Sequence, residues 1–159
     1  MNEILKLLEE DGRYTAEQIG AMTGRAAADV QADIEALEND NVILGYTTLI
    51  DWDKTEENEV SALIEVKIIP QNGEGFDRIA ERIYQYDEVE SVYLMSGSFD
   101  LAVFITGESL REIAEFVSAR LSPIEGVTAT STHFILKKYK EKHRVFNEMP
   151  RQEETVLFV

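Results

Sequence analysis

The sequence predicts an α+β protein made of two parts, a helical N-terminal part and a longer part in which strands and helices alternate. Through residue 39 the apolar residues recur at helical spacing in three separate runs. After Val60 the pattern becomes strand, helix, strand, strand, helix, strand, and the first strand alternates apolar and polar residues in period two. This order is that of a ferredoxin-like βαββαβ sandwich, in which four antiparallel strands carry two helices on one face.

Three helices and a hairpin are predicted for residues 1–50. Thr15 and Gln18 have the spacing of a capping box, which marks the start of the second helix, and Gly24 can take the positive φ that ends it. Residues 42–50 are rich in β-branched and apolar residues around one glycine, which is typical of a short hairpin. The helices are expected from about Glu3 to Asp11, Ala16 to Met22 and Ala27 to Asn39, with the hairpin at Val42 to Ile50. Together these elements predict a winged helix-turn-helix domain.

Residues 51–59 are mostly charged and hold little that could fill a core, so they are predicted to form a linker. A ferredoxin-like domain is expected at 60–137 and a C-terminal tail at 138–159. The strands of the ferredoxin-like domain are predicted at Val60–Ile69, Val89–Ser96, Leu101–Thr106 and Val127–Lys137, and its helices at Gly75–Gln85 and Leu110–Leu121. The second and third strands are apolar on both faces, although two helices cover only one face. A second copy of the same sheet is the simplest partner for the other face, which predicts at least a homodimer.

The formal net charge of the chain is −16 and its pI is near 4.4. Through Glu59 the chain holds four basic residues and fifteen acidic ones, so −11 of this charge lies in the predicted winged helix and linker. Strong acidity disfavours binding to the phosphate backbone, because long-range attraction and counterion release both require Lys and Arg. It does not exclude DNA binding through a local patch.

Composition excludes several kinds of site. The absence of cysteine excludes disulfides and thiolate zinc sites, and the two histidines, His133 and His143, cannot form an imidazole cluster. The sequence has no nucleophile and base at recognisable spacing and no phosphate loop, so we expect neither an enzyme nor a metal or other cofactor. It also lacks a signal-peptide pattern and an apolar run long enough to cross a bilayer, so a cytoplasmic protein with no membrane partner is expected.

Three segments of the sequence carry a resemblance to a known family. They are Leu7–Thr15 followed by Gln18–Gly20, then Ile34–Tyr46, and Val92–Leu101 with its Gly-x-x-Asp turn. In order and spacing the chain resembles the leucine-responsive regulatory protein/AsnC (Lrp/AsnC) family of transcription regulators over nearly its whole length. The resemblance implies a dimer, often assembled into octamers, whose winged helices bind double-stranded operator DNA. It also implies that the ferredoxin-like domains bind a small effector, usually an amino acid, between subunits.

The Gly-x-x-Asp turn is the candidate effector site. The resemblance implies that exposed backbone N–H groups at Gly97 receive a ligand carboxylate and that Asp100 receives its ammonium. Ser96 and Ser98 flank the same turn and complete the set of candidate effector-binding residues. From the residues alone, a plain tight turn is an equal alternative, because Gly and Asp favour turns without any ligand.

The third predicted helix is the candidate DNA-reading element, with Arg25, Ala28, Gln31 and Ala32 nearest the bases. Gln can bond adenine and Ala can pack on a thymine methyl group. Family members commonly have a Ser or Asp cap and two or three Arg or Lys residues on this helix. Here the cap position is Ala26, and the positions of the basic residues hold Gln31, Ala32, Asp33 and Glu35.

The sequence is therefore compatible with two functions. One is a DNA-binding transcriptional regulator whose oligomerisation and DNA affinity respond to an amino-acid-like effector. The alternative is a ligand-sensing oligomer that has lost autonomous DNA binding and acts through a protein partner. The basic run at 137–144 is usual for a solvated end, but it can also neutralise a neighbouring subunit's acidic winged helix or touch DNA that wraps an oligomer.

Overall fold

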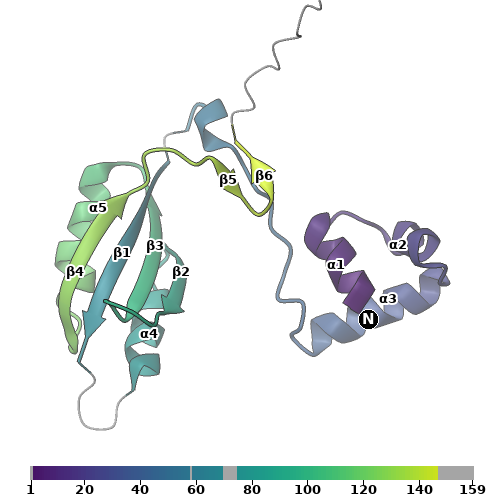
Figure 1. The fold of residues 1–159 in the computed structure, drawn as a ribbon, viewed down its shortest axis with the longest axis horizontal. Coiled ribbons are helices and arrows are strands. Elements are labelled where there is room, and N and C mark those ends of the chain that lie inside the picture. Colours follow the sequence, from purple (N-terminus) through teal and green to yellow (C-terminus); the bar gives the residue numbers. More distant parts are fainter. Residues whose placement is uncertain (1, 58, 70–74, 147–159) are drawn as a thin grey trace, which may run out of the picture. The chain divides into compact units, whose positions relative to one another are not determined.

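The computed structural model describes residues 2–57, 59–69 and 75–146, and the chain divides into two compact units, 1–50 and 51–159 (Figure 1). The first unit contains the helices α1 (Asn2–Glu10), α2 (Ala16–Thr23) and α3 (Ala27–Asn39). Their core is formed by the buried Ile4, Ile19, Val30 and Ile34, one or two from each helix. All three helices predicted from the sequence are confirmed.

Local chemistry explains how α2 begins and ends. The Thr15 hydroxyl accepts the N–H of Gln18 at 3.3 Å, and the Gln18 side chain accepts the N–H of Thr15 at 2.9 Å, so the predicted capping box forms. Gly24 closes the helix with φ 69°. A Cβ on Gly20 would lie 2.7 Å from the carbonyl oxygen of Arg25, so only glycine lets α2 and the turn into α3 approach this closely. The result is a helix-turn-helix with a three-residue turn, 24–26.

The predicted hairpin at 42–50 is wrong for this single chain, because residues 44–50 form no strand. The segment first closes α3, where Asn41 takes φ 55° and the N–H of Ile43 donates to Leu37 at 3.1 Å. Composition indicated strand because β-branched residues suit a half-buried pleated surface, but strand pairing also needs a partner. Val42, Leu44, Tyr46 and Ile50 are instead left exposed.

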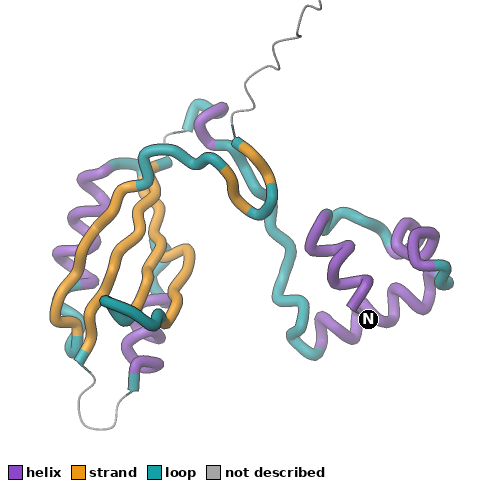
Figure 2. Tube along the Cα trace, in the orientation of Figure 1, coloured by secondary structure: helices purple, strands orange, loops and turns teal. Residues whose placement is uncertain are grey.

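The second unit is the ferredoxin-like sandwich, as predicted. Its elements are β1 (Val60–Ile68), α4 (Phe76–Tyr84), β2 (Val89–Leu94), β3 (Leu101–Gly107), α5 (Leu110–Phe116) and β4 (Val127–Phe134). The sheet is antiparallel with strand order β2-β3-β1-β4, and α5 continues as a π-helical segment, Val117–Leu121. Both helices lie on one face of the sheet (Figure 2). The core between the layers includes Ile64, Val103, Ile83, Ile113 and Leu121.

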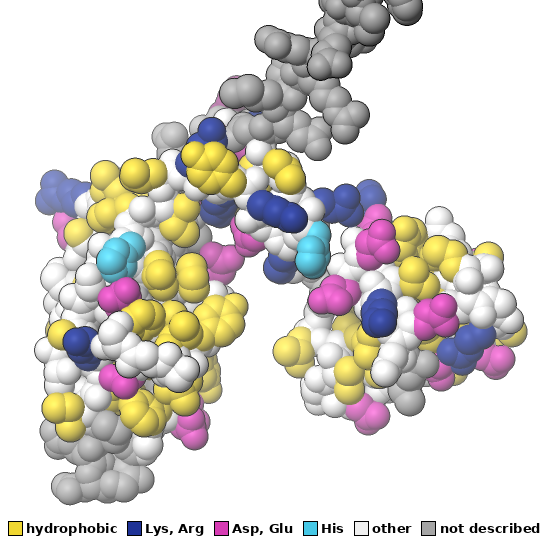
Figure 3. Space-filling view, viewed as in Figure 1, with side chains coloured by type: hydrophobic (Ala, Val, Ile, Leu, Met, Phe, Trp, Pro, Cys, Tyr) yellow, Lys and Arg dark blue, Asp and Glu magenta, His cyan; other side chains and the backbone are white. Residues whose placement is uncertain are grey.

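The other face of the sheet is not covered by a helix, and hydrophobic side chains gather on it (Figure 3). Tyr93 is 54% exposed, and its ring meets that of Phe104 edge to face at 6.1 Å. Leu63 on β1 lies opposite Phe104 on β3 and opposite His133 on β4, so these side chains share this face. An apolar face of this kind is typical of an interface.

Residues 51–57 and 59 group with the second unit and include a short 3-10 helix, Trp52–Lys54. Their role as a linker stays a prediction. Beyond β4, the first residues of the expected tail form a small hairpin from β5 (Lys140–Glu141) and β6 (Arg144–Val145). The remainder of the expected tail, 147–159, lies outside the described residues.

Candidate functional site

The four DNA-contact candidates lie at the start and on the exposed face of α3. Val30, Ile34 and Leu37 turn one face of this helix into the core. Ala28, Gln31 and Ala32 lie on the opposite, exposed face, at spacings that bring them together. Arg25 is in the turn just before the helix and is half-buried. The two alanines leave little side-chain bulk on the exposed face.

Both hydrogen-bonding candidates are engaged by acidic residues of α3. The Arg25 guanidinium donates to the Asp33 carboxylate at 2.7 Å, and the Gln31 amide donates to Glu35 at 2.9 Å. The spacing of four between Gln31 and Glu35 makes that contact predictable from the sequence, because residues four apart are neighbours on a helix. The Arg25 contact spans eight positions and depends on the turn, so no sequence pattern indicated it.

No side chain caps the N-terminus of α3. Ala26 occupies the cap position, as expected, and makes no side-chain hydrogen bond to the first N–H groups of the helix. The first turn also contains the acidic Asp29, which partly offsets the positive end of the helix dipole.

A hollow of about 530 Å³ lies beside α3 within the first unit, and the sequence did not predict it. Its lining includes Leu8, Tyr14, Ile34 and Tyr46 together with the two carboxylates Glu17 and Glu38, and it reaches the DNA-contact candidates Ala28 and Gln31. Apolar residues with acidic charges suit a neutral or cationic group and repel a phosphate.

Tyr46 is anchored at this hollow by Glu38. Its hydroxyl donates to the Glu38 carboxylate at 2.9 Å. Partial burial raises the pKa of Tyr46 above its ordinary value, and the bond to the Glu38 carboxylate raises it further.

The candidate effector residues form the turn between β2 and β3, and Asp100 has a structural role there. Its carboxylate accepts the N–H of Ile68 at 2.7 Å, and its own N–H donates to Val66 at 3.0 Å. The paired part of β3 begins with Leu101 opposite Val66, so no strand carbonyl of β3 faces the N–H of Ile68. The Asp100 side chain supplies the missing acceptor and anchors the turn to β1.

The other three candidate residues in this turn, Ser96, Gly97 and Ser98, are exposed. A Cβ built on Gly97 meets no atom within 4 Å, and the φ of Gly97 is not positive. The turn therefore does not require glycine at this position for its own conformation. Because the three residues are exposed, the turn of one chain does not by itself enclose a ligand.

On β4 the side chains alternate between the two faces of the sheet. Thr130 and Thr132 lie opposite the buried Val66 and Ile64, while Ser131 lies opposite Glu65 on the uncovered face. There the His133 Nε2 atom lies 3.3 Å from the Ser131 hydroxyl and 3.5 Å from the Glu65 carboxylate. In a catalytic triad the acid and the serine contact opposite ring nitrogens, whereas here both contact the same one. This cluster is not arranged as a triad.

Among residues 2–57, 59–69 and 75–146, no group of three or more His, Asp or Glu side chains is placed to hold a metal ion. In the same part of the chain, no helix has the length and apolar character that crossing a membrane requires.

Comparison with known proteins decides the family. Residues 61–145 match the Lrp/AsnC ligand binding domain. The uncharacterized HTH-type transcriptional regulator YugG of Bacillus subtilis is 50% identical over 145 residues, which cover 91% of this chain and 87% of YugG. The chain belongs to the Lrp/AsnC family. The relatives are transcriptional regulators and not enzymes, which confirms the resemblance and the expectation of a non-enzyme.

Solved structures of the Lrp/AsnC family share the fold. A transcriptional regulator from Neisseria meningitidis in complex with L-Met matches with a TM-score of 0.71 at 22% identity, covering 87% of this chain and 89% of that chain. A feast or famine regulatory protein from M. tuberculosis complexed with L-methionine matches with a TM-score of 0.73 at 22% identity, covering 90% and 94%. At these identities the likeness establishes the common architecture of both units.

Proposed function

We propose that this Lrp/AsnC-family regulator binds operator DNA through α3, and that a small amino-acid-like effector at the Ser96–Asp100 turn changes its oligomerisation and its DNA affinity. The observation that carries the proposal is the exposed face of α3 in a helix-turn-helix. Ala28 and Ala32 leave room for the helix to approach base edges, and Gln31 lies between them. The two solved relatives named above, each in complex with L-methionine, support the choice of effector class.

At the DNA, the Gln31 amide gives up its hydrogen bond to Glu35 and hydrogen-bonds to an adenine instead. The methyl groups of Ala28 and Ala32 pack on the methyl group of thymine. Arg25 meets a phosphate near the uncapped start of α3. These contacts are few, so the proposal predicts modest affinity and a preference for A·T-containing sites.

At the effector site, the N–H groups around Gly97 receive the ligand carboxylate, and the Ser96 and Ser98 hydroxyls are available to the same group. One carboxylate oxygen of Asp100 accepts the N–H of Ile68, and the other receives the ligand ammonium. A second copy, packed on the uncovered sheet face, completes the enclosure. Effector binding between subunits then changes how dimers pack and so resets the spacing of paired α3 helices, which couples the ligand to DNA affinity.

The test measures binding of the purified protein to its own upstream promoter fragment and to a scrambled fragment, at low and at physiological salt. Each measurement is made with and without L-methionine, and then with each other proteinogenic amino acid. Preference for the promoter fragment that persists at physiological salt, and that shifts with one amino acid, is the expected result. Absence of preference at either salt contradicts DNA reading and favours the alternative of a partner-dependent protein.

Two glycine variants test whether the effector binds at the Ser96–Asp100 turn. Gly97→Ala places a methyl group where the ligand carboxylate approaches, while Gly75→Ala, also in open space, is the matched control at the start of α4. Both variants are expected to remain folded, with at most a small loss of stability in Gly75→Ala because alanine is a poorer N-cap than glycine, and only Gly97→Ala weakens the response to the amino acid. An equal response in both contradicts the placement of the effector at this turn. Light scattering of the wild type and both variants, with and without the amino acid, measures whether the oligomeric state responds to the amino acid.

A further inference from the structure

A strongly basic segment lies at the end of the described chain. The basic hairpin, residues 137–144 with β5 and the first residue of β6, holds five of the fifteen Lys and Arg residues of the sequence and one acidic residue, Glu141. The first unit holds three basic residues against ten acidic ones. Positive charge is therefore gathered on the hairpin and scarce on the helix-turn-helix.

The turn of the hairpin is unusual for its residues. Lys142 and His143 both take positive φ, 41° and 66°, between the paired residues Glu141 and Arg144. Two-residue turns of this kind favour Asn-Gly, because a Cβ makes positive φ costly. The buried Phe146, whose N–H donates to Tyr139 at 3.0 Å, fixes the strands and so imposes the turn. Turn geometry does not explain a Lys and a His here, and such strained positions concentrate at functional sites.

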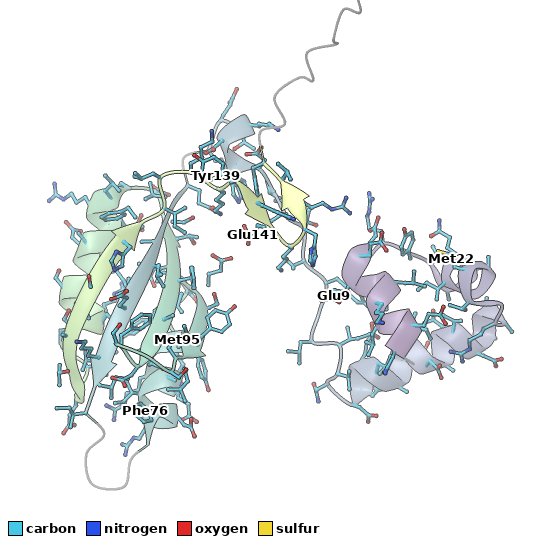
Figure 4. All side chains as sticks on the ribbon, viewed as in Figure 1. Glu9, Met22, Phe76, Met95, Tyr139 and Glu141 are labelled. Atoms are coloured by element: carbon cyan, nitrogen blue, oxygen red, sulfur yellow. The ribbon has the colours of Figure 1, made fainter. Side chains whose placement is uncertain are left out.

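Most cations of the hairpin are presented to solvent, whereas Lys138 is partly buried and its ammonium lies 3.6 Å from the Glu59 carboxylate. Lys137, Lys140, Lys142 and His143 are exposed, and Lys or Arg side chains are seen around this hairpin in Figure 3. Figure 4 labels Tyr139, which lies just before β5, and Glu141, which lies within β5 next to the exposed Lys140. Exposed cations gathered on one short segment suit a repeating anion such as the phosphate backbone of a nucleic acid.

We propose that the basic hairpin binds the phosphate backbone of duplex DNA and supplies the positive charge that α3 lacks; this inference rests on the proposed DNA-binding function. Affinity for DNA requires Lys or Arg at the phosphates, and Arg25 is engaged by Asp33. No other stretch of eight residues in the sequence holds as many cations. Lysine contacts to phosphate carry no sequence information, so the hairpin strengthens binding to every duplex and leaves base reading to α3.

The test uses the turn itself. Lys142→Asn with His143→Gly removes the cation at the tip and installs the preferred turn residues, and a second variant adds Lys140→Gln. A matched control, Arg82→Gln with Arg111→Gln, removes two exposed cations from α4 and α5 of the same unit. The probes are the promoter fragment and the scrambled fragment, titrated over a series of salt concentrations with full-length protein.

The first hairpin variant is expected to melt no lower than the wild type, because Asn-Gly suits the turn. Its slope of log affinity against log salt is expected to fall by about one, and that of the second variant by about two, with equal losses on both fragments. The control keeps the wild-type slope.

Wild-type slope and affinity in both hairpin variants overturn the inference while leaving the proposed function in place. A hairpin variant that changes particle mass in light scattering and not the salt slope also overturns it, because the hairpin then contacts the acidic unit of another copy. If the wild type binds neither fragment at any salt, the proposed function fails and the inference fails with it.

Discussion

The Arg25 guanidinium donates to the Asp33 carboxylate at 2.7 Å, and the two side chains are 35% and 32% exposed. The cation nearest the start of α3 is thus paired within its own domain. Because the pair is partly exposed, its own contribution to stability is small, about 0 to 1 kcal/mol. Its larger consequence is for binding, since a paired Arg must leave Asp33 before it can meet a phosphate.

Asp33→Asn is expected to raise DNA affinity and to steepen the salt dependence by about one unit, because it releases Arg25 for a phosphate and removes a negative charge. Asp29→Asn, on the same helix, removes the same charge without touching this pair and is the control. Fluorescence anisotropy with the promoter fragment measures both. Equal gains in the two variants would mean that the charge alone acts and that Arg25 does not reach DNA.

Gly20→Ala is expected to destabilise the helix-turn-helix by about 1 to 3 kcal/mol or more, because the new methyl group meets a backbone oxygen that cannot move without shifting the turn into α3. Gly75→Ala, in open space at the N-cap of α4, is the control and should cost less, at most about 1 kcal/mol, because alanine is a poorer N-cap than glycine. Urea unfolding followed by hydrogen exchange reports the two units separately. Loss of protection confined to residues 2–50 is the predicted pattern, and wild-type stability would disprove the close approach.

Sequence reasoning located the helices of both units and the strand order because their signals are local. Thr15, Gln18 and Gly24 act within one turn of α2, and alternation within β1 needs no knowledge of its neighbours. The contacts that define the candidate sites are not local. Asp100 and Ile68 are 32 positions apart, so only the folded sheet brings them together.

Two segments, 42–50 and 140–145, show in opposite ways that strand pairing cannot be predicted from local sequence alone. Residues 42–50 have strand composition but pair with no strand among the described residues, whereas β5 and β6 pair although Lys142-His143 lacks the Asn-Gly signal. In both segments, strand pairing depends more on whether the rest of the chain offers a surface for the strands to pack against than on the residues of the turn. Burial of Phe146 decides the second case.

Alkaline pH is expected to weaken the first unit through Tyr46. The pKa of this hydroxyl is raised in the folded state by partial burial and by Glu38, so the folded state holds the proton more tightly than the unfolded state does. The stabilisation is complete below the ordinary tyrosine pKa of about 10 and is lost as pH rises through the folded pKa.

Tyr46→Phe should therefore show a shallower loss of stability above pH 10 than the wild type. At neutral pH it should cost no more than about 1 kcal/mol, because Tyr46 is half-exposed. Thermal melts over a pH series check both, with Tyr14→Phe as the control at the same hollow. Parallel curves for the wild type and Tyr46→Phe would show that the contact with Glu38 has no thermodynamic weight.

Asp100 is predicted to have two separable roles, one in folding and one in ligand binding. Asp100→Ala leaves the N–H of Ile68 without its acceptor and is expected to cost about 1 to 3 kcal/mol in urea unfolding. Asp100→Asn keeps a side-chain oxygen for that N–H and removes the charge. It should lose less stability than Asp100→Ala.

The same two variants separate the ligand role when titrated with the amino acid that shifts DNA binding. If Asp100 receives the ligand ammonium, Asp100→Asn weakens effector binding by about tenfold, because a hydrogen bond to a charged group contributes about 1.5 to 3 kcal/mol, roughly twice as much as a neutral one. Wild-type effector affinity in Asp100→Asn would limit Asp100 to anchoring the turn on β1. Equal destabilisation by Asn and Ala would instead mean that the negative charge itself, rather than an acceptor oxygen, holds Ile68.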